Sequence, residues 1–282
     1  MVHRTGGPSL LSQAVRTGAT TRDDGSLPGV LGHGAAATVR DTGRVPPRFE
    51  ELDFRSTPRG DVSLRRRSDP VLGTDVYEVL LGDEYLMSSA FTVAEEELAR
   101  LVLAQLPGSG LEVVVGGLGL GCTAAAALAD ARVGSVRVVD AFDAVIEWHQ
   151  RQLLPASASL LDDRCRLVAA DFFAGLHDAT AWGLTSSGSV DAVLLDIDHS
   201  PQHLLHPDHA VLYDRQGLRA LARRLRPGGA FGLWSGDPPD EPFLEELRAV
   251  FDVADAHTVS FANRYTGGTS SNTVYVARLV RD

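Results

Sequence analysis

Beyond residue 110, runs of apolar residues alternate with glycine-rich turns and helix-forming stretches. The β-branched run 113–115 suits a strand buried on both faces, and the alanines 124–127 that follow the glycines are strong helix formers. Repetition of this pattern predicts strands near 112–116, 135–140, 164–169, 190–196, 228–234, 252–260 and 273–280, and helices near 121–131, 142–153, 213–225 and 241–250. Such alternation indicates an α/β fold with a mainly parallel sheet.

The last two expected strands are joined only by residues 263–272, which contain no helical pattern. Because a parallel connection needs a longer crossover, we expect these strands to be antiparallel. A doubly wound, Rossmann-like sheet that ends in an antiparallel strand resembles the class I methyltransferase architecture.

The N-terminal part has a different pattern. Residues 1–48 are rich in Gly, Thr, Ser and Arg, and we expect a flexible tail. Residues 49–90 contain short alternating runs between turn signals, which predict a small antiparallel β-domain. A helix should begin at Thr92, with Glu95 at capping-box spacing. We expect this helix and the alternating pattern after it to form one Rossmann-like catalytic domain, residues 91–282.

Glycines at the end of the first parallel strand provide the candidate ligand site. Residues without a Cβ let the backbone approach a ligand, and the next helix directs free N–H groups at the same place. An acid about 20 residues later, Asp140, is placed to bind both ribose hydroxyls. These residues predict a nucleoside site that includes Gly116, Gly117, Leu118, Gly119 and Gly121.

The ends of the next two expected strands carry further acids. After one strand come Ala170, Asp171 and Phe172, where the carboxylate can bind an exocyclic amine and the ring can cover a purine, although Asp171 could also simply cap a helix that begins at Phe172. After the next come Asp196 and Asp198, followed by His199. Two acids at this position need a cationic partner, and these three residues are the catalytic candidates.

Charge and composition exclude several classes of function. The net charge of −11 argues against a nucleic-acid partner, and no apolar stretch predicts a membrane span or a secretory signal. Two cysteines without disulfide or zinc spacing fit a reducing, cytoplasmic location. Histidines 199, 203, 206 and 209 could bind a metal, but we favour a lid loop over the pocket and expect no metal, because Pro207 would break a regular ligand-bearing helix.

The order of β-meander, glycine turn, Asp140, Asp171 and Asp196 resembles the spermidine synthase family of aminopropyltransferases over roughly residues 50 to 280. The resemblance implies that Asp140 binds ribose, Asp171 binds adenine and Asp196 is catalytic. It also implies a co-substrate of the S-adenosylmethionine type, in its decarboxylated form for true aminopropyl transfer. Family members are often dimers or tetramers, so a homodimer is one expectation.

The sequence departs from this family where the donor and the polyamine bind. The family loop carries an Asp for the amine of decarboxylated S-adenosylmethionine, whereas Leu118-Gly119-Leu120 carries no acid. A donor that keeps its carboxylate would be repelled by such an Asp and tolerated by bare backbone N–H groups. The Tyr of the family's Phe-x-Tyr-x-Glu stretch is replaced by Val93.

We therefore expect a transferase that moves an aminopropyl, aminocarboxypropyl or methyl group to a small acceptor, expected to be a cationic amine. Asp196 would hold the amine and take up its proton, assisted by Asp198 or His199. Tyr213 and Trp234 are candidates for the acceptor pocket. The alternatives are a methyltransferase proper and a noncatalytic protein that binds a nucleoside thioether.

Overall fold

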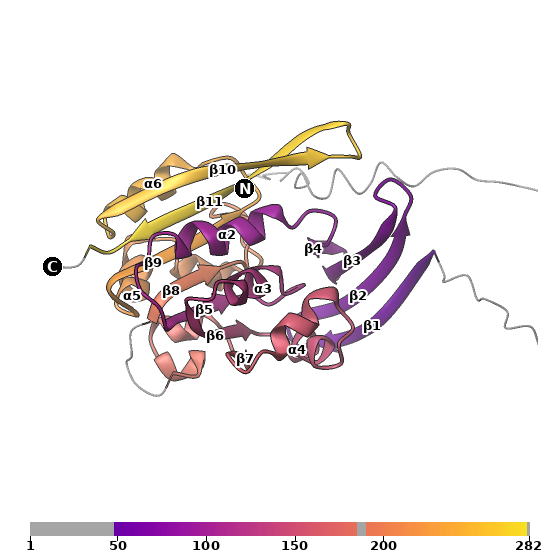
Figure 1. Cartoon of the computed structure of the whole chain (residues 1–282), viewed down its shortest axis with the longest axis horizontal. Helices are drawn as coiled ribbons and strands as arrows, with labels where there is room; N and C mark the ends of the chain where they lie inside the picture. Colours follow the sequence, from indigo (N-terminus) through magenta and orange to yellow (C-terminus); the bar gives the residue numbers. More distant parts are fainter. Residues whose placement is uncertain (1–47, 185–189, 281–282) are drawn as a thin grey trace, which may run out of the picture.

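A computed structural model describes residues 48–184 and 190–280, which form two β-sheets with associated helices (Figure 1). Apart from Arg48, the expected tail 1–48 lies outside these residues. The smaller sheet is an antiparallel meander in chain order, which agrees with the pattern of residues 49–90. Its strands are β1 (Phe49–Thr57), β2 (Gly60–Asp69), β3 (Thr74–Leu81) and β4 (Glu84–Ser88).

The larger sheet has the order β10-β11-β9-β8-β5-β6-β7. All neighbouring pairs from β9 to β7 are parallel, whereas β11 runs antiparallel to both β9 and β10, as the short last connection predicts. This arrangement confirms the expected class I methyltransferase sheet. Its strands are β5 (Leu111–Gly116), β6 (Val133–Asp140), β7 (Cys165–Ala169), β8 (Val190–Leu195), β9 (Leu225–Ser235), β10 (Val253–Asn263) and β11 (Gly268–Arg278).

Strand β5 lies at the point where the strand order reverses, because it pairs with β6 on one side and with β8 on the other. In open α/β sheets, ligands bind outside the carboxyl ends of the strands at this switch point. The glycine turn follows β5 directly. The topology therefore selects the same location as the glycine pattern.

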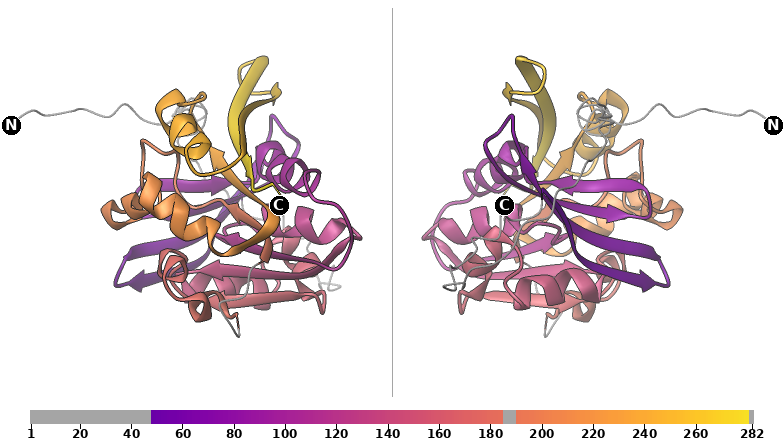
Figure 2. Two further views of the ribbon diagram at one scale, coloured as in Figure 1. Left: turned by 90° about the vertical axis from the view of Figure 1, so that its left-hand side faces the viewer. Right: turned by 90° about the vertical axis from the view of Figure 1, so that its right-hand side faces the viewer.

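Helices cover both faces of the large sheet, as Figure 2 shows from two sides. Alternate side chains of β5 point to opposite faces: Val113 and Val115 belong to one hydrophobic core and Val114 to the other. The first core includes α2 (Val93–Leu103), α3 (Cys122–Ala129) and α4 (Asp143–Gln150), together with residues of the small sheet. The second includes α5 (Arg215–Ala222) and α6 (Glu241–Arg248).

Two of the polar contacts that fasten the small sheet to the rest of the molecule come from aromatic side chains. Trp148 of α4 donates its indole N–H to the carboxylate of Asp53 in β1, at 2.8 Å. At the other end, the hydroxyl of Tyr265, in the β10–β11 connection, donates to the carboxylate of Asp69 at 2.6 Å. The inner side chains Val62 and Leu64 of β2 are fully buried in the first core. These contacts hold β3 and β4 over the end of the large sheet that carries the glycine turn.

Two local expectations need correction. Thr92 is the N-cap of α2 but its side chain caps no backbone N–H; its hydroxyl donates instead to the Glu96 carboxylate at 3.0 Å. Glu95 points into the protein and is 6% exposed, so the capping box with Thr92 is wrong. After Asp171 the chain forms 3₁₀ turns, Phe173–Leu176 and Ala179–Trp182, where a helix was expected to begin at Phe172.

No helix among residues 48–184 and 190–280 is long and apolar enough to cross a membrane.

Candidate functional site

The glycine turn between β5 and α3 is shaped by close contacts that exclude side chains. Gly117 has φ +90°, and a Cβ there would lie 2.1 Å from the backbone oxygen of Asp196. A Cβ on Gly116 would lie 2.6 Å from the ring of Phe172. Only glycine therefore permits the turn after β5 to pass so close to the residue that follows β8 and to the ring of Phe172.

Asp140, the last residue of β6, fixes the conformation of this turn. Its carboxylate accepts the backbone N–H of Leu118 at 2.8 Å and that of Phe142 at 2.8 Å. Burial raises the pKa of Asp140, while the backbone N–H groups act in the opposite direction. A carboxylate can accept about four hydrogen bonds. With the backbone N–H of Gly119 as a third neighbour, Asp140 keeps room for a further hydrogen bond, and it lines the cavity.

His149 of α4 supports the turn from behind, a role that sequence reasoning missed. Its Nε2 lies 2.9 Å from the backbone oxygen of Gly119, and its Nδ1 lies 3.1 Å from the hydroxyl of Ser157. Burial lowers the pKa of His149. The neutral ring with Nε2–H donating to Gly119 and Nδ1 accepting from Ser157 satisfies both contacts. No sign of this contact was visible in the sequence, because His149 comes near the turn only when α4 packs against it in the folded protein.

Asp171 and Phe172 lie beyond the end of β7. One oxygen of Asp171 accepts the backbone N–H of Phe173 at 2.9 Å, and the other accepts from Arg59 at 3.0 Å. Arg59 comes from the β1–β2 turn, so this ion pair joins the two sheets at the cavity. The Phe172 ring stacks on Trp182 with centroids 4.9 Å apart, which fixes the ring at the cavity wall.

Asp196 follows β8 and is half-buried at the cavity. Its carboxylate accepts a hydrogen bond from the hydroxyl of Thr123 at 2.8 Å. Removal from bulk water raises the pKa of Asp196 to about 6, and the hydrogen bond from Thr123 opposes the shift. In the described part of the chain, no Arg or His forms an ion pair with this carboxylate.

The carboxylate that interacts electrostatically with Asp196 is Glu95 of α2, which the sequence pattern had assigned to a helix cap. Burial, and then the charge of Asp196, raise the pKa of Glu95 well above its ordinary value. The periodicity of α2 could have identified Glu95, because it stands between the buried positions Ala94 and Leu98. The sequence suggested Asp198 as the partner of Asp196, and the structure pairs Asp196 with Glu95 instead.

Asp198 makes contacts with a different group of residues. Its buried carboxylate accepts from the backbone N–H of Leu205 at 2.7 Å and from the hydroxyl of Tyr213 at 2.8 Å, and it lies 2.8 Å from Nδ1 of His209. These bonds fold the segment after β8 back over the sheet edge. Tyr213, expected in the acceptor pocket, is directed toward Asp198 and does not line the cavity.

The histidines of this segment have separate partners. His199 lies 3.0 Å from the Glu84 carboxylate, and His203 lies 2.7 Å from Asp237. His209 stacks on Phe173 with centroids 4.0 Å apart. Across residues 48–184 and 190–280, no three His, Cys, Asp or Glu side chains are grouped so as to hold a metal ion.

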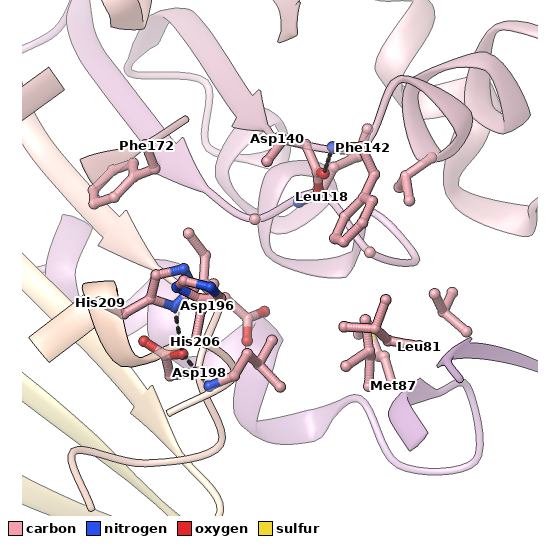
Figure 3. Close-up of a pocket in the computed structure, with 18 of the residues that line it drawn as sticks. Leu81, Met87, Leu118, Asp140, Phe142, Phe172, Asp196, Asp198, His206 and His209 are labelled. Carbon is pink, nitrogen blue, oxygen red and sulfur yellow. Dashed lines mark hydrogen bonds and ion pairs between the residues drawn. The ribbon is translucent and has the colours of Figure 1, made fainter. Parts of the chain in front are cut away.

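A single cavity brings most of the expected residues together (Figure 3). It encloses about 1190 Å³ of space, its open mouth included. Figure 3 shows Asp140 and Phe142 on one side, Asp196, Asp198 and His209 on another, and Leu81 and Met87 across from the latter. The expected residues that line it are Gly117, Leu118, Gly119, Asp140, Asp171, Phe172, Asp196, Asp198, His199 and Trp234.

Four expected residues lie behind the cavity surface and do not line it: Gly116, Gly121, Ala170 and Tyr213. The two glycines shape the turn, since each lacks room for a Cβ. Ala170 donates its backbone N–H to the backbone oxygen of Asp140 at 3.0 Å.

The small sheet supplies an apolar wall that the sequence did not predict. Leu81 of β3 and Leu86 and Met87 of β4 line the cavity opposite the acids. The sulfur of Met87 also accepts the backbone N–H of Leu120 at 3.3 Å, so β4 touches the glycine turn directly. The enclosed space is therefore apolar on one side and acidic on the other.

No protein-family model and no curated protein matches the sequence. Among solved structures, the fold is similar to a spermidine synthase in complex with the transition state analogue AdoDATO, with a TM-score of 0.64, 18% identity, and coverage of 82% of this chain and 74% of that chain. Spermidine synthase from Thermotoga maritima gives a TM-score of 0.63 at 18% identity, covering 82% and 74%.

A probable spermidine synthase from Corynebacterium glutamicum ATCC 13032 gives a TM-score of 0.54 at 15% identity, covering 81% of this chain and 79% of that chain. At such identities the likeness concerns the fold. It confirms the fold that the sequence resemblance implied, including the meander that precedes the large sheet.

Proposed function

We propose that this chain is a transferase that moves an alkyl group from an adenosyl sulfonium compound to a small amine. The observation that supports this most strongly is that the glycine turn, Asp140, Asp171 and Asp196 all line one cavity at the switch point of the sheet. Three acids at the ends of successive strands offer acceptors for a sugar, a base and a cationic nucleophile.

The donor would lie between the glycine turn and the end of β6. The acceptor position left on Asp140 suits a ribose hydroxyl, and Asp171 with Phe172 suits the amine and the face of adenine. Adenine would take the Asp171 oxygen that now accepts from Arg59. That ion pair is about 40% exposed on both sides, so the contact is weak enough to rearrange.

Asp196 is suited to hold and deprotonate the acceptor amine. A largely desolvated carboxylate without a cationic partner favours an ammonium ion, and its pKa of about 6 lets it ionise near neutral pH and accept a proton. The amine nitrogen then attacks the carbon beside the sulfonium. A C–N bond forms, the C–S bond breaks with its electron pair going to sulfur, and the ammonium proton goes to Asp196.

The group that is transferred depends on the form of the donor. The fold shared with the spermidine synthases, one of them bound to the analogue AdoDATO, supports aminopropyl transfer from decarboxylated S-adenosylmethionine. The absence of an acid at Leu118-Gly119-Leu120 leaves aminocarboxypropyl and methyl transfer as alternatives. Each reaction releases a different thioether from the donor, and this difference identifies the group.

The test is turnover with S-adenosylmethionine and its decarboxylated form against a panel of small amines, with the thioether product identified by mass spectrometry. We expect Asp196→Asn to abolish turnover and to leave the affinity for methylthioadenosine, which has no ammonium group, within a few-fold, because Asn keeps the shape and loses the base. Asp163→Asn, an exposed change before β7, is the matched control. Unchanged turnover in Asp196→Asn would contradict the assignment.

A further inference from the structure

The carboxyl group of Glu95 is buried at the cavity without a cationic partner. It belongs to the first turn of α2, is 6% exposed, and lines the cavity together with Asp196. In the part of the chain that the structure describes, no Arg or His forms an ion pair with it and no side chain donates a hydrogen bond to it. The next residue, Glu96, is exposed and accepts from the hydroxyl of Thr92.

The groups near Glu95 make the charged form of its carboxylate still less favourable. Asp196 and Cys122 both lie close enough to interact electrostatically with it, and Glu96 adds a further negative charge. Thr123, the only neighbour of Asp196 that donates a side-chain hydrogen bond among the described residues, is neutral. Two desolvated carboxylates so placed must either retain a proton or bind a cation.

The position of Glu95 and Asp196 indicates which kind of cation they bind. Thr123, which donates to Asp196, belongs to the start of α3 directly after the glycine turn, so the pair lies next to the turn where the donor is proposed to bind. The turn itself contributes no acid. A metal ion would need additional ligands, and no suitable group of ligands exists among the described residues. A primary ammonium group needs only the acceptors that two carboxylates provide.

We propose that Glu95 and Asp196 together bind a primary ammonium group of the substrates. The proposal rests on the proposed function, because it assumes that an adenosyl compound occupies the neighbouring part of the cavity. Glu95 supplies from α2 the negative charge that the glycine turn lacks. The ammonium can belong to the aminoalkyl chain of the donor or to the acceptor amine, which share this chemistry.

The test compares Glu95→Gln with the matched control Glu96→Gln by calorimetry. The probes are methylthioadenosine, which has no ammonium group, decarboxylated S-adenosylmethionine, and a small amine titrated into protein saturated with methylthioadenosine. We expect Glu95→Gln to weaken at least one ammonium-bearing probe about tenfold or more and to leave methylthioadenosine within twofold. Glu96→Gln should change none of them.

The probe that is weakened identifies the source of the ammonium group. Binding of that probe near pH 7 should also release protons in the wild type and fewer in Glu95→Gln, because the cation displaces a proton from the pair. Ammonium affinities equal in Glu95→Gln and in the wild type would overturn the proposal, even if methylthioadenosine binds. Failure of methylthioadenosine to bind the wild type would instead overturn the proposed function.

Discussion

At the scale of single residues, the ionisation of Asp196 connects stability with function. Its folded pKa of about 6 lies above the ordinary value of 3.8, because removal from bulk water disfavours the charge. The stability that this group contributes is therefore fully present below pH 3.8 and is lost as the pH rises through about 6. A site prepared for a cation is thus destabilising while it is empty at neutral pH.

We predict that Asp196→Asn raises the free energy of unfolding at pH 8 by up to about 3 kcal/mol and that the gain disappears near pH 4. Asn retains the hydrogen bond from Thr123 but carries no charge. Urea unfolding at several pH values measures this difference. Asp162→Asn should show the opposite sign, since a hydrogen bond from Arg164 lowers the pKa of Asp162 to about 2. A loss of stability in Asp196→Asn at pH 8 would contradict the account.

The strand-end acids could be predicted from sequence because each follows an apolar run whose end is visible. Asp140, Asp171 and Asp196 required only the rule that parallel strands end at the same edge. Glu95 was missed because the spacing from Thr92 matched a helix cap, and the burial of one face of α2 overrode that local pattern. The hydrogen bonds of Asp198 could not be predicted, because they depend on how a segment without regular structure folds back.

At the scale of elements, the turn after β5 depends on the absence of a side chain at Gly117. We predict that Gly117→Ala costs at least about 3 kcal/mol of unfolding free energy, from the positive φ and from overlap with the Asp196 backbone. Gly108→Ala is a matched control, because Gly108 has φ +87° and no atom lies within 4 Å of the place that its added methyl group would take. Chemical unfolding measures both variants. Equal costs would show that the close approach is unimportant.

The segment between β8 and α5 depends in a similar way on Asp198. Asp198→Ala leaves His209, the Tyr213 hydroxyl and the Leu205 N–H without their acceptor. We predict a loss of about 3–5 kcal/mol in urea unfolding, as for other broken buried pairs. Asp208→Ala, with its side chain 89% exposed, should stay within about 0.5 kcal/mol of the wild type. A small effect of Asp198→Ala would mean that other contacts hold this segment.

Most strands and helices of the large sheet could be predicted from apolar runs and glycine punctuation. Strand β1 gave a weaker signal, because Phe49–Thr57 carries four acidic or basic residues and no continuous apolar run. The 3₁₀ turns after Asp171 were mistaken for a helix start, since a short apolar stretch fits either structure.

At the scale of the whole molecule, the small sheet completes the cavity that the large sheet begins. The contacts of Trp148 with Asp53 and of Tyr265 with Asp69 hold it in place. Its apolar wall lines the same cavity as Glu95 and Asp196. This geometry suits a substrate with an ammonium end and an apolar body. Sequence could predict that both sheets exist, but not that Leu81 and Met87 would close the cavity, because that depends on how the sheets dock.

We propose above all that this cavity binds an adenosyl compound through Asp140. This proposal is tested most directly by calorimetric titration of methylthioadenosine into the wild type, Asp140→Ala and the exposed control Asp163→Ala. The account predicts saturable binding to the wild type and the control. Asp140→Ala should bind about 1–3 kcal/mol more weakly, the usual effect of leaving buried hydroxyls unpaired. Absence of binding to the wild type, or equal affinity in Asp140→Ala, would contradict it.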